Sequence, residues 1–181
     1  MAERPLIKGV SMRKAKKKVK AKTLAHKRKK YGPRLPKYEH LVKLPHKMLV
    51  LYAFNTVKLI PRWEKDVLAV NIAALVQSWL DGHGDITLIH EYVDIYNKAE
   101  DLNLYRVSDI AIAFSYICDT ILDDHAEESW LAYDSAHNAT SYVLKYVPRS
   151  HKCRIRTKIA KNYRELRDFD KILEQYLLGT A

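Results

Sequence analysis

Residues 150–178 read SHKCRIRTKIAKNYRELRDFDKILEQYLL, and this stretch decides the fold because it carries the clearest helical pattern in the chain. Its apolar residues recur at alternating intervals of four and three positions, which places them in one stripe along an α-helix. The stripe consists of Ile155, Ile159, Asn162, Leu166, Phe169, Leu173 and Tyr176. We therefore predict a long amphipathic helix over about residues 150–178, with this stripe as its partner interface.

Two partners fit this stripe, and the sequence leaves both open. The first, which we favour, is the helical body that precedes it in the same chain, and the second is another copy of the chain. Asn162 is a lone polar residue in the stripe, and such a residue can fix the register or the number of packed helices. The opposite face of the helix is cationic and carries Arg154, Arg156, Lys158, Lys161, Arg164, Arg167 and Lys171.

The rest of the body is also predicted to be helical. The 181 residues include only 5 Gly and 6 Pro, which argues against the many turns of a β-sandwich. Helical spacing predicts five further helices, over about residues 45–59, 61–81, 86–99, 109–123 and 127–147. Pro61 is expected to start the second of these, which is apolar nearly all round and therefore expected at the buried centre. We predict an all-α protein with about six helices in one compact domain, residues 38–181.

Charge is strongly segregated along the chain. Residues 1–37 carry 15 Lys and Arg and one acid, a net charge of +14, whereas residues 52–144 carry a net −10 and residues 145–181 a net +6. The first segment has no apolar stripe, and its lysines repel one another. We therefore expect residues 1–37 to form a flexible basic N-terminal arm, separated from the body by Gly32, Pro33 and Pro36.

A basic arm of this kind is typical of proteins that bind nucleic acid. When Lys and Arg neutralise phosphates, counterions are released, so the affinity falls steeply as the salt concentration rises. The arm has few side chains that can recognise the edges of bases. We predict binding to DNA or RNA with weak sequence specificity. The predicted binding residues of the arm, hereafter the arm cations, are Arg13, Lys14, Lys16, Lys17, Lys18, Lys20, Lys22, Lys27, Arg28, Lys29 and Lys30. A second predicted cluster lies where the last helix begins, at the end that favours anions, and contains Lys152, Arg154, Arg156, Lys158 and Lys161.

Other functions remain open. The arm also has the two-part pattern of a nuclear import signal, so we expect a cytoplasmic protein, or a nuclear one in a eukaryotic host. The acidic middle of the chain could bind a basic partner or the arm itself, which would make the chain a protein-binding module such as an inhibitor, an adaptor or an oligomeric scaffold. Three tyrosines near the basic C-terminal region could stack on bases, although core packing is the favoured interpretation: Tyr142, Tyr146 and Tyr163.

The sequence gives little support to catalysis, metal binding or membrane insertion. No phosphate-binding glycine loop or nucleophile motif is present, so we expect no enzyme, no catalytic residue and no cofactor. No apolar run is long enough to span a bilayer, and the two cysteines, Cys118 and Cys153, lie in unlike surroundings that do not predict a disulfide. An acidic cluster is interpreted mainly as the cap of a helix at residue 124, with a metal-dependent enzyme as a minor alternative: Asp119, Asp123, Asp124, His125, Glu127 and Glu128.

One short segment resembles a known family. Residues 79–86, WLDGHGDI, are similar to a helix junction in the small DNA-packaging subunits of some tailed phages, which also combine a helical body with basic ends. The resemblance covers eight residues and implies a viral packaging subunit as one form of the protein-binding alternative. It assigns no role to any single residue.

Overall fold

The computed structural model describes residues 32–101, 108–123 and 130–177, and these residues contain α-helices and one short 3-10 helix but no strand. This confirms the all-α prediction. The elements are α2 (Tyr38–Leu41), α3 (His46–Val57), η1 (Trp63–Lys65), α4 (Val67–Leu80), α5 (Ile86–Asp101), α6 (Asp109–Leu122), α7 (Trp130–Tyr146) and α8 (Lys152–Leu177). The predicted start of the fifth helix, near Glu127, lies outside the described residues.

Helix starts follow the capping residues of the sequence. Ser108 caps α6 as predicted, because its Oγ accepts a hydrogen bond from the backbone N–H of Ala111 at 3.0 Å. Asp66 caps α4 in the same way, accepting from the N–H of Ala69 at 2.9 Å, and it also accepts a hydrogen bond from the Ser108 hydroxyl. The two caps therefore hold the first turns of α4 and α6 side by side.

The predicted start of the second helix at Pro61 is wrong. Arg62 adopts a left-handed backbone conformation with φ of 65°, and the 3-10 helix η1 separates it from α4. A left-handed residue cannot continue a right-handed helix, so the chain turns after Pro61 and begins an α-helix only where Asp66 can cap it.

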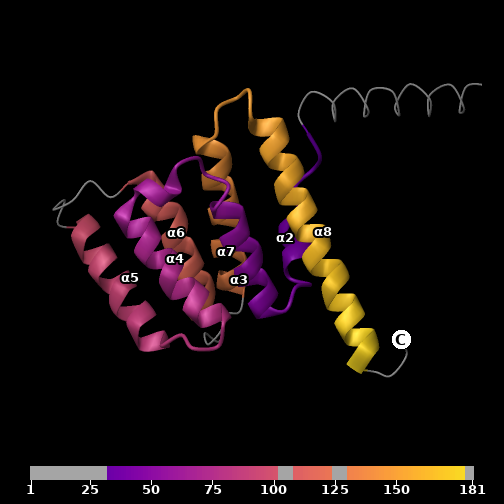
Figure 1. Ribbon diagram of the computed structural model, residues 1–181, viewed down its shortest axis with the longest axis horizontal. Coiled ribbons are helices and arrows are strands. Elements are labelled where there is room, and N and C mark those ends of the chain that lie inside the picture. The colour runs from indigo at the N-terminus through magenta and orange to yellow at the C-terminus, as the bar shows by residue number, and fades with distance from the viewer. Residues whose placement is uncertain (1–31, 102–107, 124–129, 178–181) are drawn as a thin grey trace, which may run out of the picture.

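Three helices form the centre of the molecule, and the others cover them on two sides. In the described part of the chain, α6 and α7 pack on each other and on α3, and both α4 and α5 pack on α6. Figure 1 shows α5 at one side of the molecule and α2 and α8 at the other. The central helices share buried contacts such as the edge-to-face pair of Phe54 and Phe114, whose ring centroids are 6.5 Å apart. Tyr52 is buried beside Thr140, and its hydroxyl lies 3.2 Å from the Thr140 hydroxyl. Burial raises the pKa of Tyr52 to about 12.

The position of α4 differs from the prediction that it is the buried centre. One face of α4 is buried through Ile72, Val76 and Leu80, but Val67 is 74% exposed and Val70 is also exposed. Among the described residues, α3, η1 and α6 make the main contacts with α4, and the exposed Val67 and Val70 lie away from the face that carries its buried residues. An apolar sequence all round a helix is therefore not sufficient to place that helix at the centre.

Half of the predicted stripe of α8 docks on the body of the same chain. Ile155, Ile159 and Leu166 are buried, and the amide of Asn162 donates a hydrogen bond to the carbonyl oxygen of Tyr52 on α3 at 3.1 Å. This confirms intramolecular docking for the first half of the stripe. Its continuation is exposed, with Phe169 at 53% and Leu173 at 42%, and the side chain of Tyr176 is outside the described part of the chain.

Two further predictions concern the cysteines and the membrane. Cys118 is buried, Cys153 is partly buried and both are free thiols, as expected from their unlike surroundings. No helix in the described ranges combines the length and the apolar character that a membrane span requires.

Candidate nucleic-acid interface

The structure describes one of the two predicted groups of cations. The arm cations, from Arg13 to Lys30, lie outside the described residues. The second group occupies the first turns of α8, where Arg154, Lys158 and Lys161 are exposed and Lys152 and Arg156 are partly buried.

The first described residue of the chain packs against this same part of α8. Gly32 has a φ of 78°, and a Cβ atom at this position would lie 3.1 Å from the carbonyl oxygen of Cys153 and 3.3 Å from the Cβ of Arg156. Such a close approach, in a left-handed conformation, fits glycine and few other residues. In Figure 1 the indigo segment that begins at residue 32 runs beside the upper part of α8. The end of the basic arm is thereby fixed beside Cys153 and Arg156, within the first turns of α8 that also carry Arg154 and Lys158 on another side of the helix.

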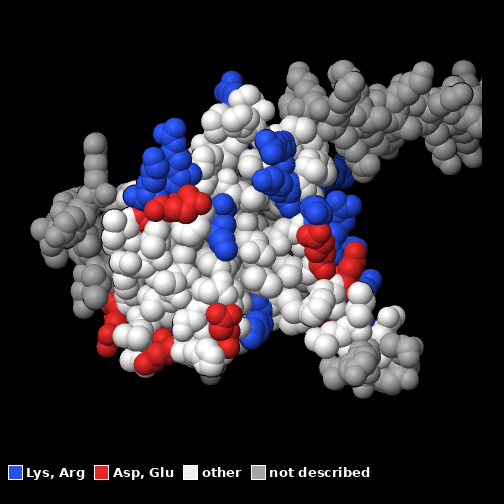
Figure 2. Space-filling view, in the orientation of Figure 1, with Lys and Arg blue, Asp and Glu red and all other residues white. Residues whose placement is uncertain are grey.

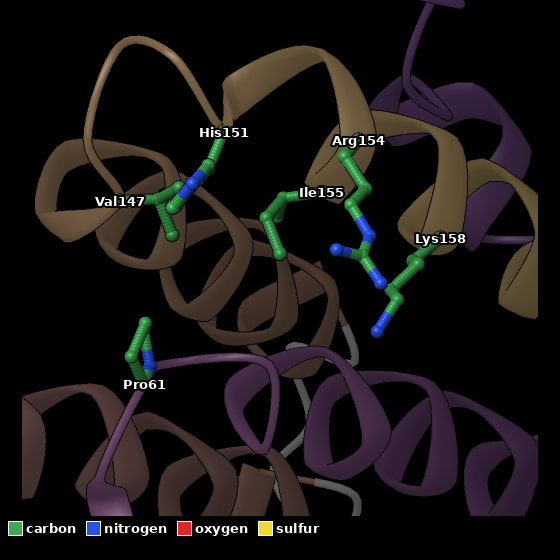
Figure 3. Close-up of a pocket in the computed structure, with 6 residues that line it drawn as sticks. All are labelled: Pro61, Val147, His151, Arg154, Ile155 and Lys158. Carbon is green, nitrogen blue, oxygen red and sulfur yellow. The ribbon is translucent and has the colours of Figure 1, made fainter.

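Two of the α8 cations line an open hollow of about 200 Å³. We call it the α8 hollow, and its lining consists of Pro61, Val147, His151, Arg154, Ile155 and Lys158. Figure 3 shows the Arg154 and Lys158 side chains extending from α8 with their charged ends close together, while Pro61 lies across the hollow from them and His151 points toward Val147. The hollow therefore has an apolar floor and a cationic rim.

The charges at the rim are not balanced within the described part of the protein. There, no acidic side chain forms an ion pair with Arg154 or Lys158, whereas Lys161 pairs with Glu165 at 3.2 Å. Arg154 and Lys158 are one helical turn apart, and like charges at this spacing cost roughly 0.2–0.5 kcal/mol. Cations in the first turn of a helix also oppose its dipole. A bound anion would remove both costs.

Sequence reasoning missed further cations that join this end of the molecule. Asn162 contacts Tyr52 on α3, whereas Ile155, which is earlier in α8, lines the hollow with Pro61, which follows α3. The two helices therefore run antiparallel. The exposed Lys58 and Arg62 at the end of α3 therefore lie near the start of α8, and Figure 2 shows Lys and Arg gathered toward this end. Only the antiparallel packing reveals this grouping, because about ninety residues of sequence separate the two segments.

The tyrosines offer less to a nucleic acid than the cations do. Tyr163 is buried, and its hydroxyl donates a hydrogen bond to the carbonyl oxygen of His40 at 3.1 Å, so it is not free to stack on a base. Tyr142 and Tyr146 stack on each other with ring centroids 6.0 Å apart, and the ammonium of Lys145 lies 5.1 Å from the Tyr142 ring. The burial of Tyr163 and the packing of the partly buried Tyr142 on the core agree with the favoured interpretation.

The acidic cluster is only partly described. Burial, and secondarily the charge of Asp123, raises the pKa of Asp119 to about 6. Burial also raises the pKa of Asp123, opposed by a hydrogen bond from the Ser135 hydroxyl and by the nearby His46. Four predicted members lie outside the described residues, and so does the cap predicted at residue 124: Asp124, His125, Glu127 and Glu128. Within the described ranges, no group of three or more potential ligands could hold a metal ion.

Comparisons with known proteins give no relative for this arrangement. The chain matches no protein-family profile, no curated protein and no solved structure.

Proposed function

We propose that this chain is a non-catalytic protein that binds nucleic acid through the arm cations and the exposed cations at the start of α8. The single observation that carries the proposal is the packing of Gly32 against Cys153 and Arg156. Lys30 precedes Gly32 by two residues, so both groups of cations can act on the same stretch of phosphate backbone. Binding is electrostatic and has weak sequence specificity, as suits a regulatory, packaging or structural role.

The position of the arm's attachment also favours an external partner over the acidic surface of the same chain. Exposed acids lie at the turn between α4 and α5 and along α5, including Asp81, Asp85 and Glu91. In Figure 1, α5 and α8 are at opposite sides of the molecule. An arm attached beside α8 reaches a polyanion bound at α8 before it reaches these acids.

A salt series tests this function with the full chain, an arm variant and a control variant. Fluorescence anisotropy with duplex DNA, duplex RNA and single strands compares the wild type with one arm variant. The arm variant combines Lys14→Gln, Lys16→Gln, Lys17→Gln and Lys18→Gln. Each lost phosphate contact lowers the log–log salt slope by about 0.7–0.9, so we expect a slope lower by about three and a large loss of affinity. The control combines Lys43→Gln and Lys47→Gln, exposed lysines at the other end of α3. Wild-type affinity and slope in the arm variant would refute the proposal.

A second candidate function is self-association, because the stripe of α8 continues past the body. Phe169 is 53% exposed, Ile172 63% and Leu173 42%, and all three lie on the last turns of one helix. Large apolar side chains exposed together mark contact surfaces. Light scattering over a range of protein concentrations measures this directly, and a monomer at every concentration would exclude it.

A further inference from the structure

We propose that the α8 hollow is a phosphate-binding site that holds one phosphate group of a nucleic-acid strand between Arg154 and Lys158. The inference rests on the proposed function and deepens it by assigning one contact to one site. Arg154 and Lys158 extend into the same space from adjacent turns of α8, as Figure 3 shows.

The cationic side chains at the rim of the hollow suit the oxygen atoms of a phosphate group. The planar guanidinium of Arg can donate two parallel hydrogen bonds to two phosphate oxygens, and the ammonium of Lys can donate to a third. In the described part of the chain neither Arg154 nor Lys158 forms an ion pair, so both are available to an anion. By contrast, Glu165 already pairs with Lys161 on the next turn.

The size of the hollow indicates a piece of a polymer and not a whole small molecule. Pockets that enclose a small ligand usually measure about 300–1,000 Å³, whereas this one measures about 200 Å³ and is open to solvent. It has room for a phosphate group with its adjoining sugar against Pro61 and Ile155. The remainder of the ligand must lie outside, along the surface.

The position of the hollow places it across α8 from the arm. At 3.6 residues per turn, Arg154 and Lys158 lie on nearly the opposite side of α8 from Cys153 and Arg156, against which Gly32 packs. A helix with its side chains is about 10–12 Å wide. A strand that crosses the outward face of α8 can therefore contact the hollow on one side and the arm on the other.

The test uses full-length Arg154→Gln with Lys158→Gln, and the same control as above, Lys43→Gln with Lys47→Gln, which removes equal charge elsewhere. Anisotropy is measured on one oligonucleotide carrying either a 5′-hydroxyl or a 5′-phosphate. We expect about tenfold weaker binding and a salt slope lower by about 0.7–0.9, the value for one phosphate contact, in the hollow variant, with the control within twofold of wild type. Equal losses in the two variants would overturn the inference.

The two oligonucleotides distinguish the sources of the phosphate. If the hollow holds an internal phosphate, the hollow variant weakens both equally. If it holds a terminal phosphate, the 5′-phosphate strengthens binding to the wild type and not to the hollow variant. Either result supports the site, and a hollow variant that matches the control on both oligonucleotides refutes it.

A second variant separates the shape of the site from its charge. His151→Trp places a large ring in the hollow and leaves Arg154 and Lys158 unchanged, so we expect affinity to fall several-fold. Unchanged affinity in this variant would count against a site inside the hollow. If the arm variant loses affinity while both hollow variants bind like the control, the phosphate site is refuted and the proposed function stands. If the arm variant and both hollow variants bind like the wild type, the phosphate site and the proposed function are both refuted.

Discussion

The two halves of α8 share one sequence pattern but differ in environment. Ile159 in the first half is fully buried, whereas Leu173 in the second half, at an equivalent position of the stripe, is 42% exposed. The cause is length. The 26 residues of α8 span about 39 Å, and the 12 residues of α3, the helix beneath it, span about 18 Å. A periodic stripe therefore predicts an amphipathic helix, but the size of the body decides how much of that stripe is covered.

The largest expected effect comes from truncating a buried residue of the first half. Ile159→Ala should lower the free energy of unfolding by about 2–5 kcal/mol, because it removes buried methyl groups and leaves a cavity. Leu173→Ala, its counterpart in the second half, should change that free energy by less than about 0.5 kcal/mol. Urea unfolding followed by circular dichroism measures both. Similar losses in the two variants would show that the second half is also packed.

Local features of the fold could be predicted from the sequence. Pro45 marks the start of α3 because its ring fixes a backbone angle that suits a helix, and Ser108 caps α6 through a hydrogen bond from a backbone group three residues away. The docking of the first half of α8 followed from its stripe. The start of α4 was not predicted, since Asp66 had to be recognised as a cap after the left-handed Arg62, and nothing in the spacing of apolar residues signals that turn.

The candidate site could be predicted only in part, for a different reason. The sequence identifies Arg154 and Lys158 as cations, but the α8 hollow also needs Pro61 and Val147, which other segments supply. The approach of Gly32 to Cys153 joins residues more than one hundred positions apart. Such contacts depend on how the helices pack, and no local pattern encodes them.

The next prediction concerns the pH dependence of stability and tests whether the docked half of α8 unfolds together with the body. Asp119 on α6 has a pKa raised to about 6 by burial and by Asp123, so its charged form is disfavoured in the folded state. Stability should therefore decrease as pH rises from about 4 to about 6 and stay lower above that range. Asp119→Asn should remove this loss and be more stable than wild type by roughly 1–2 kcal/mol above pH 6, after allowance for partial exposure.

Thermal unfolding at several pH values measures this difference with two probes. Tryptophan fluorescence reports on the body, because Trp63, Trp79 and Trp130 all lie outside α8, and circular dichroism adds the helical signal of α8. The two transitions should coincide in wild type and variant, because the first half of α8 packs on the same core. If the Asp119→Asn substitution left the circular-dichroism transition unchanged, α8 would unfold separately from the body.

A smaller effect is expected at the polar residue of the docked half. The amide of Asn162 donates to the Tyr52 carbonyl and accepts from the Asn55 amide at 3.4 Å. Asn162→Ala should lower the free energy of unfolding by about 1 kcal/mol, the usual net contribution of a hydrogen bond. A double-mutant cycle with Asn55→Ala isolates the contact between the two amides, and strictly additive losses would show that they do not interact.

The smallest effect on stability is expected where the stripe leaves the body. Phe169→Ser combined with Leu173→Ser removes exposed side chains and should change the free energy of unfolding of the isolated chain by less than about 0.5 kcal/mol. The same change should abolish self-association, since these residues supply the apolar surface for it. Association stabilises the folded state by mass action, so the wild-type Tm should rise with protein concentration and that of the variant should not. If both Tm values rise equally, the contact between copies lies elsewhere, and if neither rises, the second half of α8 is not a self-association surface.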